Sequence, residues 1–241
     1  MKQVGFEKIN NKDVFNILTE PEKKTNKLVV MSHGFRGTSI GPARSFVDFE
    51  TELLKEGFSV LRFDQPNGGN SEGEYVNSSF NEWVDTTTYF AKKYLDMDYK
   101  VALLGQSMGA TVTVVASARA ELTDKIECLI LWVPDPKSTF NKNPDQIYEE
   151  AGQKYPGTFW QEASDSDFFS CLEKFKKNIH LVYGERDKYI SEELRNKVMD
   201  KVKKMGHEIM MLPGQDHGSW KFDVAQKVYQ EGLIILKNSF N

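Results

Sequence analysis

The sequence predicts an α/β protein in which a mostly parallel central sheet carries helices on both faces. Short apolar runs alternate with longer helical segments along most of the 241 residues, which is typical of strands joined by helical crossovers. Polar and glycine-containing segments directly follow several of these runs. Such segments gather at the carboxyl edge of a parallel sheet, where sites are usually built. The length suits one domain, residues 1–241, with a full core.

The first two expected strands form a hairpin rather than a crossover unit. Residues 4–9 and 13–18 are joined by Asn-Asn-Lys, which suits a tight turn. Local chemistry marks several helix ends: Gly57 suits a helix C-cap, and Ser79 with Glu82 suits a capping box. Further strands are expected at 27–32, 58–63, 100–104, 129–133, 179–183 and 208–212, and helices at 43–56, 80–95, 110–120, 191–205 and 222–237.

One long segment, residues 135–177, interrupts the alternation of strands and helices. It separates two expected strands by about forty residues, well above the usual connection length. Because connections of that length are usually functional, we expect a small cap insertion over the site. Its aromatic side chains either anchor the cap to the body or line a substrate pocket; they are Tyr148, Tyr155, Phe159, Trp160, Phe168 and Phe169.

Composition excludes several classes of protein. The net charge of −4 and the pI near 5.7 provide no basic surface for nucleic acid. Two cysteines are too few for a disulfide framework. The N-terminal residues lack the apolar core of a signal peptide, and no stretch is long enough to span a bilayer. A cytoplasmic protein without a nucleic-acid or membrane partner is therefore expected.

The most informative motif is Gly-Gln-Ser-Met-Gly at positions 105–109. It lies between an apolar run and a helical stretch of small residues. A strand that turns sharply into a helix holds the central residue, Ser107, in a strained conformation with its Oγ exposed. Glycines are needed on both sides because a Cβ there would collide with a neighbouring strand or helix. This context predicts a nucleophilic serine rather than an incidental one in a glycine-rich turn.

Four other segments follow expected strands and converge on the same edge. They are His33-Gly34-Phe35, the polar loop 64–71, the turn 184–187 and Asp216-His217-Gly218. The chain order Ser107, Asp187, His217 is that of the α/β-hydrolases. Convergence of this kind is typical of an active site.

Taken together, these motifs resemble the α/β-hydrolase fold serine hydrolases over nearly the whole chain. Within that superfamily the sequence is similar to small bacterial carboxylesterases, including cinnamoyl and feruloyl esterases, and to the serine aminopeptidase-like group. The loop 64–71 resembles the D-x-x-G-x-G-x-S turn of these proteins, except that Asn67 replaces the first glycine. Asn tolerates left-handed backbone better than most residues, so the turn can survive.

The resemblance and the residue types imply roles for five residues. Ser107 would be the nucleophile, His217 the general base, and Asp187 the carboxylate that orients the histidine. The backbone N–H groups of Phe35 and Met108 would form the oxyanion hole.

Each role has a competitor in the sequence. Asp135 also follows a strand and is the rival acid, whereas Asp216 is too near His217 along the chain to reach round its ring easily. His180 is expected to be a packed core residue and His207 a solvated one. The four histidines show no metal-ligand spacing, so no metal or other cofactor is expected.

The expected activity is hydrolysis of carboxylic esters of small molecules through an acyl-enzyme. Aryl-acid, cinnamoyl-type esters are a specific possibility because the cap is aromatic, with Tyr155, Phe159 and Trp160 as candidate substrate contacts. Hydrolysis of amides or peptides by the same three residues is one alternative. A ligand-binding receptor on the same fold is another, although a pure binder need not keep all three groups.

Overall fold

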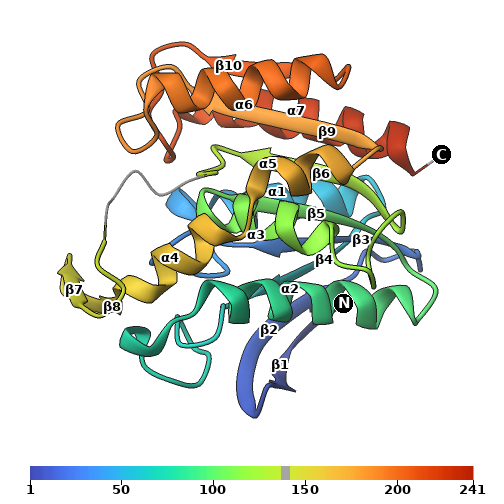
Figure 1. Cartoon of the computed structure of the whole chain (residues 1–241). Coiled ribbons are helices and arrows are strands. Elements are labelled where there is room, and N and C mark those ends of the chain that lie inside the picture. The colour runs from blue at the N-terminus through green and yellow to red at the C-terminus, as the bar shows by residue number, and fades with distance from the viewer. Residues whose placement is uncertain (137–141, 241) are drawn as a thin grey trace.

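The computed structural model describes residues 1–136 and 142–240, which form one eight-stranded sheet with helices on both faces (Figure 1). The strand order is β1-β2-β4-β3-β5-β6-β9-β10. The hairpin β1–β2 is antiparallel and also pairs antiparallel with β4, whereas all the other neighbours are parallel. The strands are β1 (Lys2–Ile9), β2 (Lys12–Thr19), β3 (Lys27–Ser32), β4 (Ser59–Phe63), β5 (Lys100–Gln106), β6 (Ile126–Trp132), β9 (Asn178–Gly184) and β10 (Ile209–Leu212).

Two apolar cores lie on opposite faces of the sheet. Alternate residues of the central strands face each side: Leu129 and Leu131 of β6 join one core, while Ile130 and Trp132 join the other. The first core is covered by α2 (Phe80–Leu95), α3 (Met108–Ser117) and α6 (Glu192–Lys204). The second is covered by α1 (Ser45–Lys55) and α7 (Phe222–Ser239). This arrangement is the α/β-hydrolase fold that the sequence predicts.

Several predicted helix ends are found, and one is displaced. The Ser79 side chain accepts from the N–H of Glu82, and Gly57 has a φ of +80° after α1. The expected helix 43–56 begins later, at Ser45. A short 3₁₀ turn, η1 (Pro42–Arg44), precedes it, because Ala43 and Arg44 have left-handed φ angles of 49° and 66°.

The segment between β6 and β9 forms a small cap. It contains a two-stranded hairpin, β7 (Ile147–Glu150) and β8 (Gln153–Pro156), followed by α4 (Gly157–Asp165) and α5 (Phe168–Lys174). The hairpin projects at the left of Figure 1. Residues 137–141 of the expected cap lie outside the described residues.

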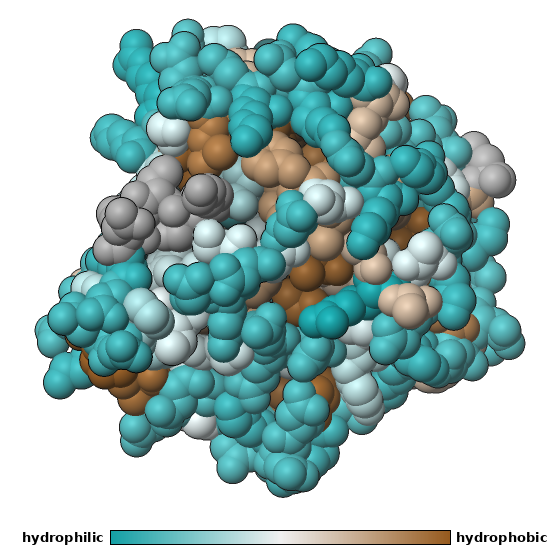
Figure 2. Space-filling view, in the orientation of Figure 1, coloured by the Kyte–Doolittle hydropathy of each residue, from teal (hydrophilic) through white to brown (hydrophobic). Residues whose placement is uncertain are grey.

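The surface seen in Figure 2 is dominated by hydrophilic side chains, and hydrophobic ones appear between them in separate places. Among the described residues, no helix is both long and apolar enough to cross a membrane.

Candidate active site

Ser107 occupies a strained turn between β5 and α3. Its φ and ψ are 56° and −124°, outside the regions that a side chain normally allows. The flanking glycines make the turn possible. A Cβ on Gly105 would lie 2.3 Å from the carbonyl oxygen of Gly109, and one on Gly109 would lie 2.1 Å from that of Ser32. The local sequence therefore folds into the strand–turn–helix that its glycines predict.

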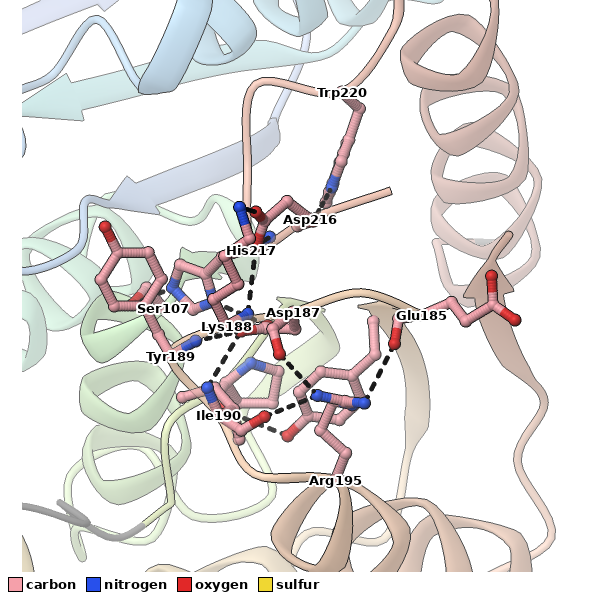
Figure 3. Close-up of polar contacts among 12 residues, drawn as sticks. Ser107, Glu185, Asp187, Lys188, Tyr189, Ile190, Arg195, Asp216, His217 and Trp220 are labelled. Atoms are coloured by element: carbon pink, nitrogen blue, oxygen red, sulfur yellow. Dashed lines mark hydrogen bonds and ion pairs between the residues drawn. The ribbon is translucent and has the colours of Figure 1, made fainter. Parts of the chain in front are cut away.

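Three side chains meet at this turn through a continuous chain of hydrogen bonds (Figure 3). The Oγ of Ser107 lies 2.7 Å from Nε2 of His217, and Nδ1 of the same ring lies 2.7 Å from Oδ2 of Asp187. An N–H on Nδ1 donates to the carboxylate and leaves Nε2 free to accept from the serine hydroxyl. The structure thus brings together the three residues that the sequence places after separate strands.

The loop after β9 holds the Asp187 carboxylate in place. Its side chain is fully buried, and Oδ1 accepts from the backbone N–H groups of Tyr189 and Ile190, each at 2.9 Å. The buried Arg195 of α6 supports the same loop (Figure 3): its Nη1 donates to the carbonyl oxygens of Asp187 and Ile190, and its Nη2 donates to that of Glu185. The carboxylate therefore has partners for both oxygens and a braced backbone.

A second carboxylate, Asp216, shapes the histidine loop from outside. Its Oδ1 accepts from the N–H groups of His217 and Lys188 at 2.8 Å and 3.1 Å. Burial opposes ionisation, but these hydrogen bonds and the Lys188 charge lower the pKa of Asp216 overall. This residue ties the Asp187 loop to the His217 loop.

The loop after β3 is fixed by a neutral histidine. Nδ1 of His33 lies 2.8 Å from the carbonyl oxygen of Gly34, and its Nε2 accepts from the N–H of Gln65 at 2.9 Å. Complete burial lowers the pKa of His33, against the opposing effects of the Gly34 carbonyl and the Asp64 charge, so the ring stays neutral. Its single N–H is then used for Gly34, and the loop stays beside the end of β5.

The loop after β4 supports the loop after β3 from the other side. Asp64 accepts from the N–H groups of Ser39 and Asn70, at 2.6 Å and 2.8 Å. Asn67, the departure from the resembled turn, has a left-handed φ of 66° and donates to Glu82 at 3.0 Å. The turn thus keeps its conformation without the glycine.

Two backbone N–H groups beside Ser107 remain available. Met108 is the first residue of α3, and Phe35 is the second residue of a turn in which the N–H of Gly37 donates to the carbonyl oxygen of Gly34. Within the described parts of the chain, neither the Phe35 nor the Met108 N–H donates to a protein acceptor. Unpaired N–H groups at a helix start and a tight turn suit a developing negative charge.

Ser107 and His217 open into a cleft of about 570 Å³ beneath the cap. Trp160 lines this cleft, whereas Tyr155 and Phe159 are buried behind Phe35 and are not among its lining residues. The Phe35 ring lies 5.0 Å and 5.1 Å from those two rings, measured between centroids. Of these three aromatics, all pack against Phe35, and Trp160 alone also lines the cleft.

The other sequence candidates have separate positions. Asp135, the rival acid, lines the cleft, and its carbonyl oxygen accepts from Thr111. His180 is buried in β9, as expected, and burial lowers its pKa to about 4. His207, expected to be solvated, is partly buried before β10, which lowers its pKa. In the described ranges, no group of three or more His, Cys, Asp or Glu side chains could hold a metal ion.

The sequence matches a known protein family over more than half of the chain. Residues 23–155 match the family described as "Serine aminopeptidase, S33", which is more than half of the sequence. The chain belongs to this family of α/β hydrolases. A comparison with curated proteins gives no match.

Solved structures with the same fold include esterases and lipases. Est1E from Butyrivibrio proteoclasticus, with ferulic acid bound, is 20% identical; the match covers 95% of this chain and 97% of that one, with a TM-score of 0.80. A soluble variant of monoglyceride lipase from Saccharomyces cerevisiae, bound to a substrate analogue, is 12% identical. The match covers 99% of this chain and 95% of that one, with a TM-score of 0.83. At these identities the likeness establishes a shared fold.

For this S33 family member, sequence reasoning missed several residues at the site. Gln106 precedes Ser107 and lines the cleft, and Tyr189 places its ring 5.1 Å from that of His217. Arg36 of the loop after β3 pairs with Glu150 of the cap hairpin at 3.0 Å. Gln106 was visible as a variable position of the motif, but no sequence signal marks the pairing of Arg36 with Glu150 or the contacts of Arg195 with the Asp187 loop.

Proposed function

We propose that this protein hydrolyses carboxylic esters through an acyl-enzyme on Ser107. The observation that carries the proposal is the chain of two 2.7 Å hydrogen bonds from Ser107 through His217 to Asp187, placed at the floor of a cleft. A serine hydroxyl is a poor nucleophile unless a base takes its proton as it attacks. This arrangement supplies that base, and the base is oriented by a buried carboxylate.

The proposed reaction has two balanced halves. Oγ of Ser107 bonds to the ester carbonyl carbon while its proton passes to Nε2 of His217, and the oxyanion accepts from the N–H groups of Phe35 and Met108. When this tetrahedral intermediate collapses, the bond from the carbonyl carbon to the alcohol oxygen breaks, and the alcohol oxygen takes the proton from His217 as it leaves. Water then attacks the acyl carbon while Nε2 of His217 takes its proton. The bond from that carbon to Oγ of Ser107 breaks, and Oγ takes the proton back from His217 as the carboxylic acid leaves.

Aryl-acid esters are the finer part of the proposal. The cleft is lined by Phe35, Trp160 and Tyr189, whose faces suit a planar acyl group. Est1E, which shares the fold, binds ferulic acid in its solved structure. Action in the cytoplasm on a small-molecule ester stays a prediction from the sequence.

Amide hydrolysis is a second candidate because the matching family is described as a serine aminopeptidase. An aminopeptidase must recognise a free amino group, and Asp135 and Glu150 both line the cleft as possible partners. Aminoacyl p-nitroanilides tested beside p-nitrophenyl esters separate the two activities. Turnover of the esters alone supports the esterase proposal.

Ser107→Ala tests the nucleophile, with Ser170→Ala, an exposed serine of the cap, as the matched control. A fluorophosphonate probe should label the unaltered protein and the control once, and should not label Ser107→Ala. Ester turnover should follow the same pattern while the melting temperature stays unchanged. Labelling of Ser107→Ala at the original rate would rule out the proposed nucleophile, and binding of esters without turnover would favour a receptor.

A further inference from the structure

A second, smaller cavity of about 230 Å³ adjoins the cleft at Gln106, the residue before Ser107. The two cavities share four lining residues: Pro42, Gln106, Gly218 and Ser219. The larger one lies under the cap. The smaller one lies between α1 and α7, which cover the opposite face of the sheet. The end of β5 therefore separates two pockets that meet beside the reacting serine.

Aromatic rings form the wall of the smaller pocket. Trp132 ends β6 and is only 1% exposed, and its ring lies 5.7 Å from that of Trp220 and 5.9 Å from that of Tyr229, between centroids. Phe222, at the start of α7, is 75% exposed and also lines the pocket. Packed rings of this kind make a rigid apolar wall, which favours a ligand group that is itself flat and apolar.

Polar groups without partners accompany this apolar wall. Gln106 is 8% exposed and lines both cavities, yet its carboxamide makes no hydrogen bond with any residue in the described ranges. Within the same ranges the buried Nε1 of Trp132 and Oγ of Ser45 also lack partners, and both residues line the smaller pocket. Buried polar groups are normally hydrogen-bonded, so unpaired ones beside a cavity point to a ligand that supplies the missing partner.

We infer that the smaller pocket binds the alcohol part of the ester, while the acyl part lies in the cleft beneath the cap. The inference rests on the proposed function. The alcohol oxygen must receive its proton from Nε2 of His217, so the alcohol begins beside that ring. The three residues after His217 are Gly218, Ser219 and Trp220, and all three line the smaller pocket.

The size and charge of the pocket define the class of alcohol. A dry cavity of about 150 Å³ is known to hold benzene, so a pocket of about 230 Å³ accepts a single substituted ring and not a long chain. The exposed carboxylate of Asp48, which lies 3.8 Å from Nε of Arg44, is in its lining and disfavours an anionic group. The ligand is therefore a benzyl-type alcohol that carries a hydrogen-bond acceptor and no negative charge.

Filling the pocket tests this assignment. Ala225 of α7 is half-buried and lines the pocket, so the larger side chain of Ala225→Leu should occupy part of it. Gln230 is exposed on the same helix and lies outside the pocket, so Gln230→Leu is the matched control.

Three substrates differ in which side of the ester carries a ring. Benzyl acetate has the ring on the alcohol, methyl phenylacetate has it on the acyl group, and methyl acetate has no ring. In Ala225→Leu, kcat/KM for benzyl acetate should fall about 10-fold or more relative to methyl acetate. The ratio for methyl phenylacetate, and both ratios in the control, should be unchanged.

Two results would overturn the inference. A selective loss for methyl phenylacetate would make the pocket an acyl site, and an equal loss for all three esters would show that it is no subsite. The fluorophosphonate probe separates these results from failure of the proposed function. If the unaltered protein neither reacts with the probe nor turns over any ester, the esterase proposal itself fails.

The need for a hydrogen-bond acceptor on the alcohol is tested on the unaltered protein with two esters of similar size. 4-Methoxybenzyl acetate carries an ether oxygen where 4-ethylbenzyl acetate carries a methylene group. We expect kcat/KM to favour the methoxy ester several-fold, because its oxygen can accept from a donor in the pocket. Equal values would refute the polar part of the assignment.

Discussion

The rings of Phe35 and Trp160 lie 4.7 Å apart, between centroids, and join the loop after β3 to the cap. Phe35 lines the cleft together with Ser107, while Trp160 belongs to α4 and lines the same cleft. The ion pair between Arg36 and Glu150 links the same two segments a few residues away. The cap therefore packs directly on the loop that carries the Phe35 N–H, the group proposed to stabilise the oxyanion.

Replacement of Trp160 should change substrate selection. In Trp160→Ala we expect the ratio of kcat/KM for a bulky aryl ester to that for an acetate to change, because a cleft-lining ring is removed. Phe169→Ala, which removes a cap aromatic outside the cleft lining, should leave the ratio unchanged. The ratio is independent of the fraction of folded protein. Equal losses for both esters would show that Trp160 only packs against Phe35, and the aryl-ester suggestion would lose its support.

Arg195 should affect turnover through Asp187 without touching substrate. Arg195→Met removes the donors that brace the loop carbonyls of Glu185, Asp187 and Ile190. A displacement of about 1 Å at a reacting group can cost about 100-fold in rate, so we expect kcat to fall between about 10- and 100-fold with little change in KM. Arg186→Met, exposed on the same loop, is the control. An unchanged kcat would show that the loop holds Asp187 without the guanidinium.

His180 should make folding stability depend on pH. It is buried in β9, and burial lowers its pKa to about 4 from the usual value near 6.5. As the pH falls, the unfolded chain takes up the proton first, so stability is full above about pH 6.5 and declines toward pH 4. Between pH 7 and pH 4.5, the free energy of unfolding should fall by about 2 kcal/mol less in His180→Leu than in the unaltered protein, measured by urea unfolding. An identical loss in the variant and the unaltered protein would contradict this.

Local signals explain why much of the fold was predictable. The turn at Ser107 follows from glycines that no other residue can replace, and the caps at Ser79 and Gly57 depend on near neighbours. The β7–β8 hairpin was not predicted. Its turn uses Ala151 and Gly152 with φ of 50° and 78°, and alanine rarely adopts a left-handed conformation. The pattern therefore did not look like a turn.

The candidate site was predictable where the chemistry lies in the motifs and unpredictable where it depends on packing. Ser107, Asp187 and His217 each follow a strand, so the sheet brings them to one edge. The smaller pocket needs Trp132, Trp220 and Tyr229, which come from three separate segments, and no sequence motif links the three. Which face of β6 carries Trp132 depends on the register of the sheet, and only the structure shows it.

The identity of the acid gives the sharpest test of the proposed mechanism. Nδ1 of His217 lies 2.7 Å from Asp187, whereas the rival, Asp135, lines the cleft after β6. A carboxylate at Nδ1 fixes the histidine tautomer, and the Asp→Asn change in a serine protease with the same three catalytic residues costs about 10⁴ in kcat. We expect Asp187→Asn to lower kcat by several orders of magnitude with little change in melting temperature, and Asp135→Asn to lower it far less. Stopped assays at pH 7 with one p-nitrophenyl ester compare the two variants directly. The reverse order would move the acid to Asp135 and leave the Ser107–His217 pair in place.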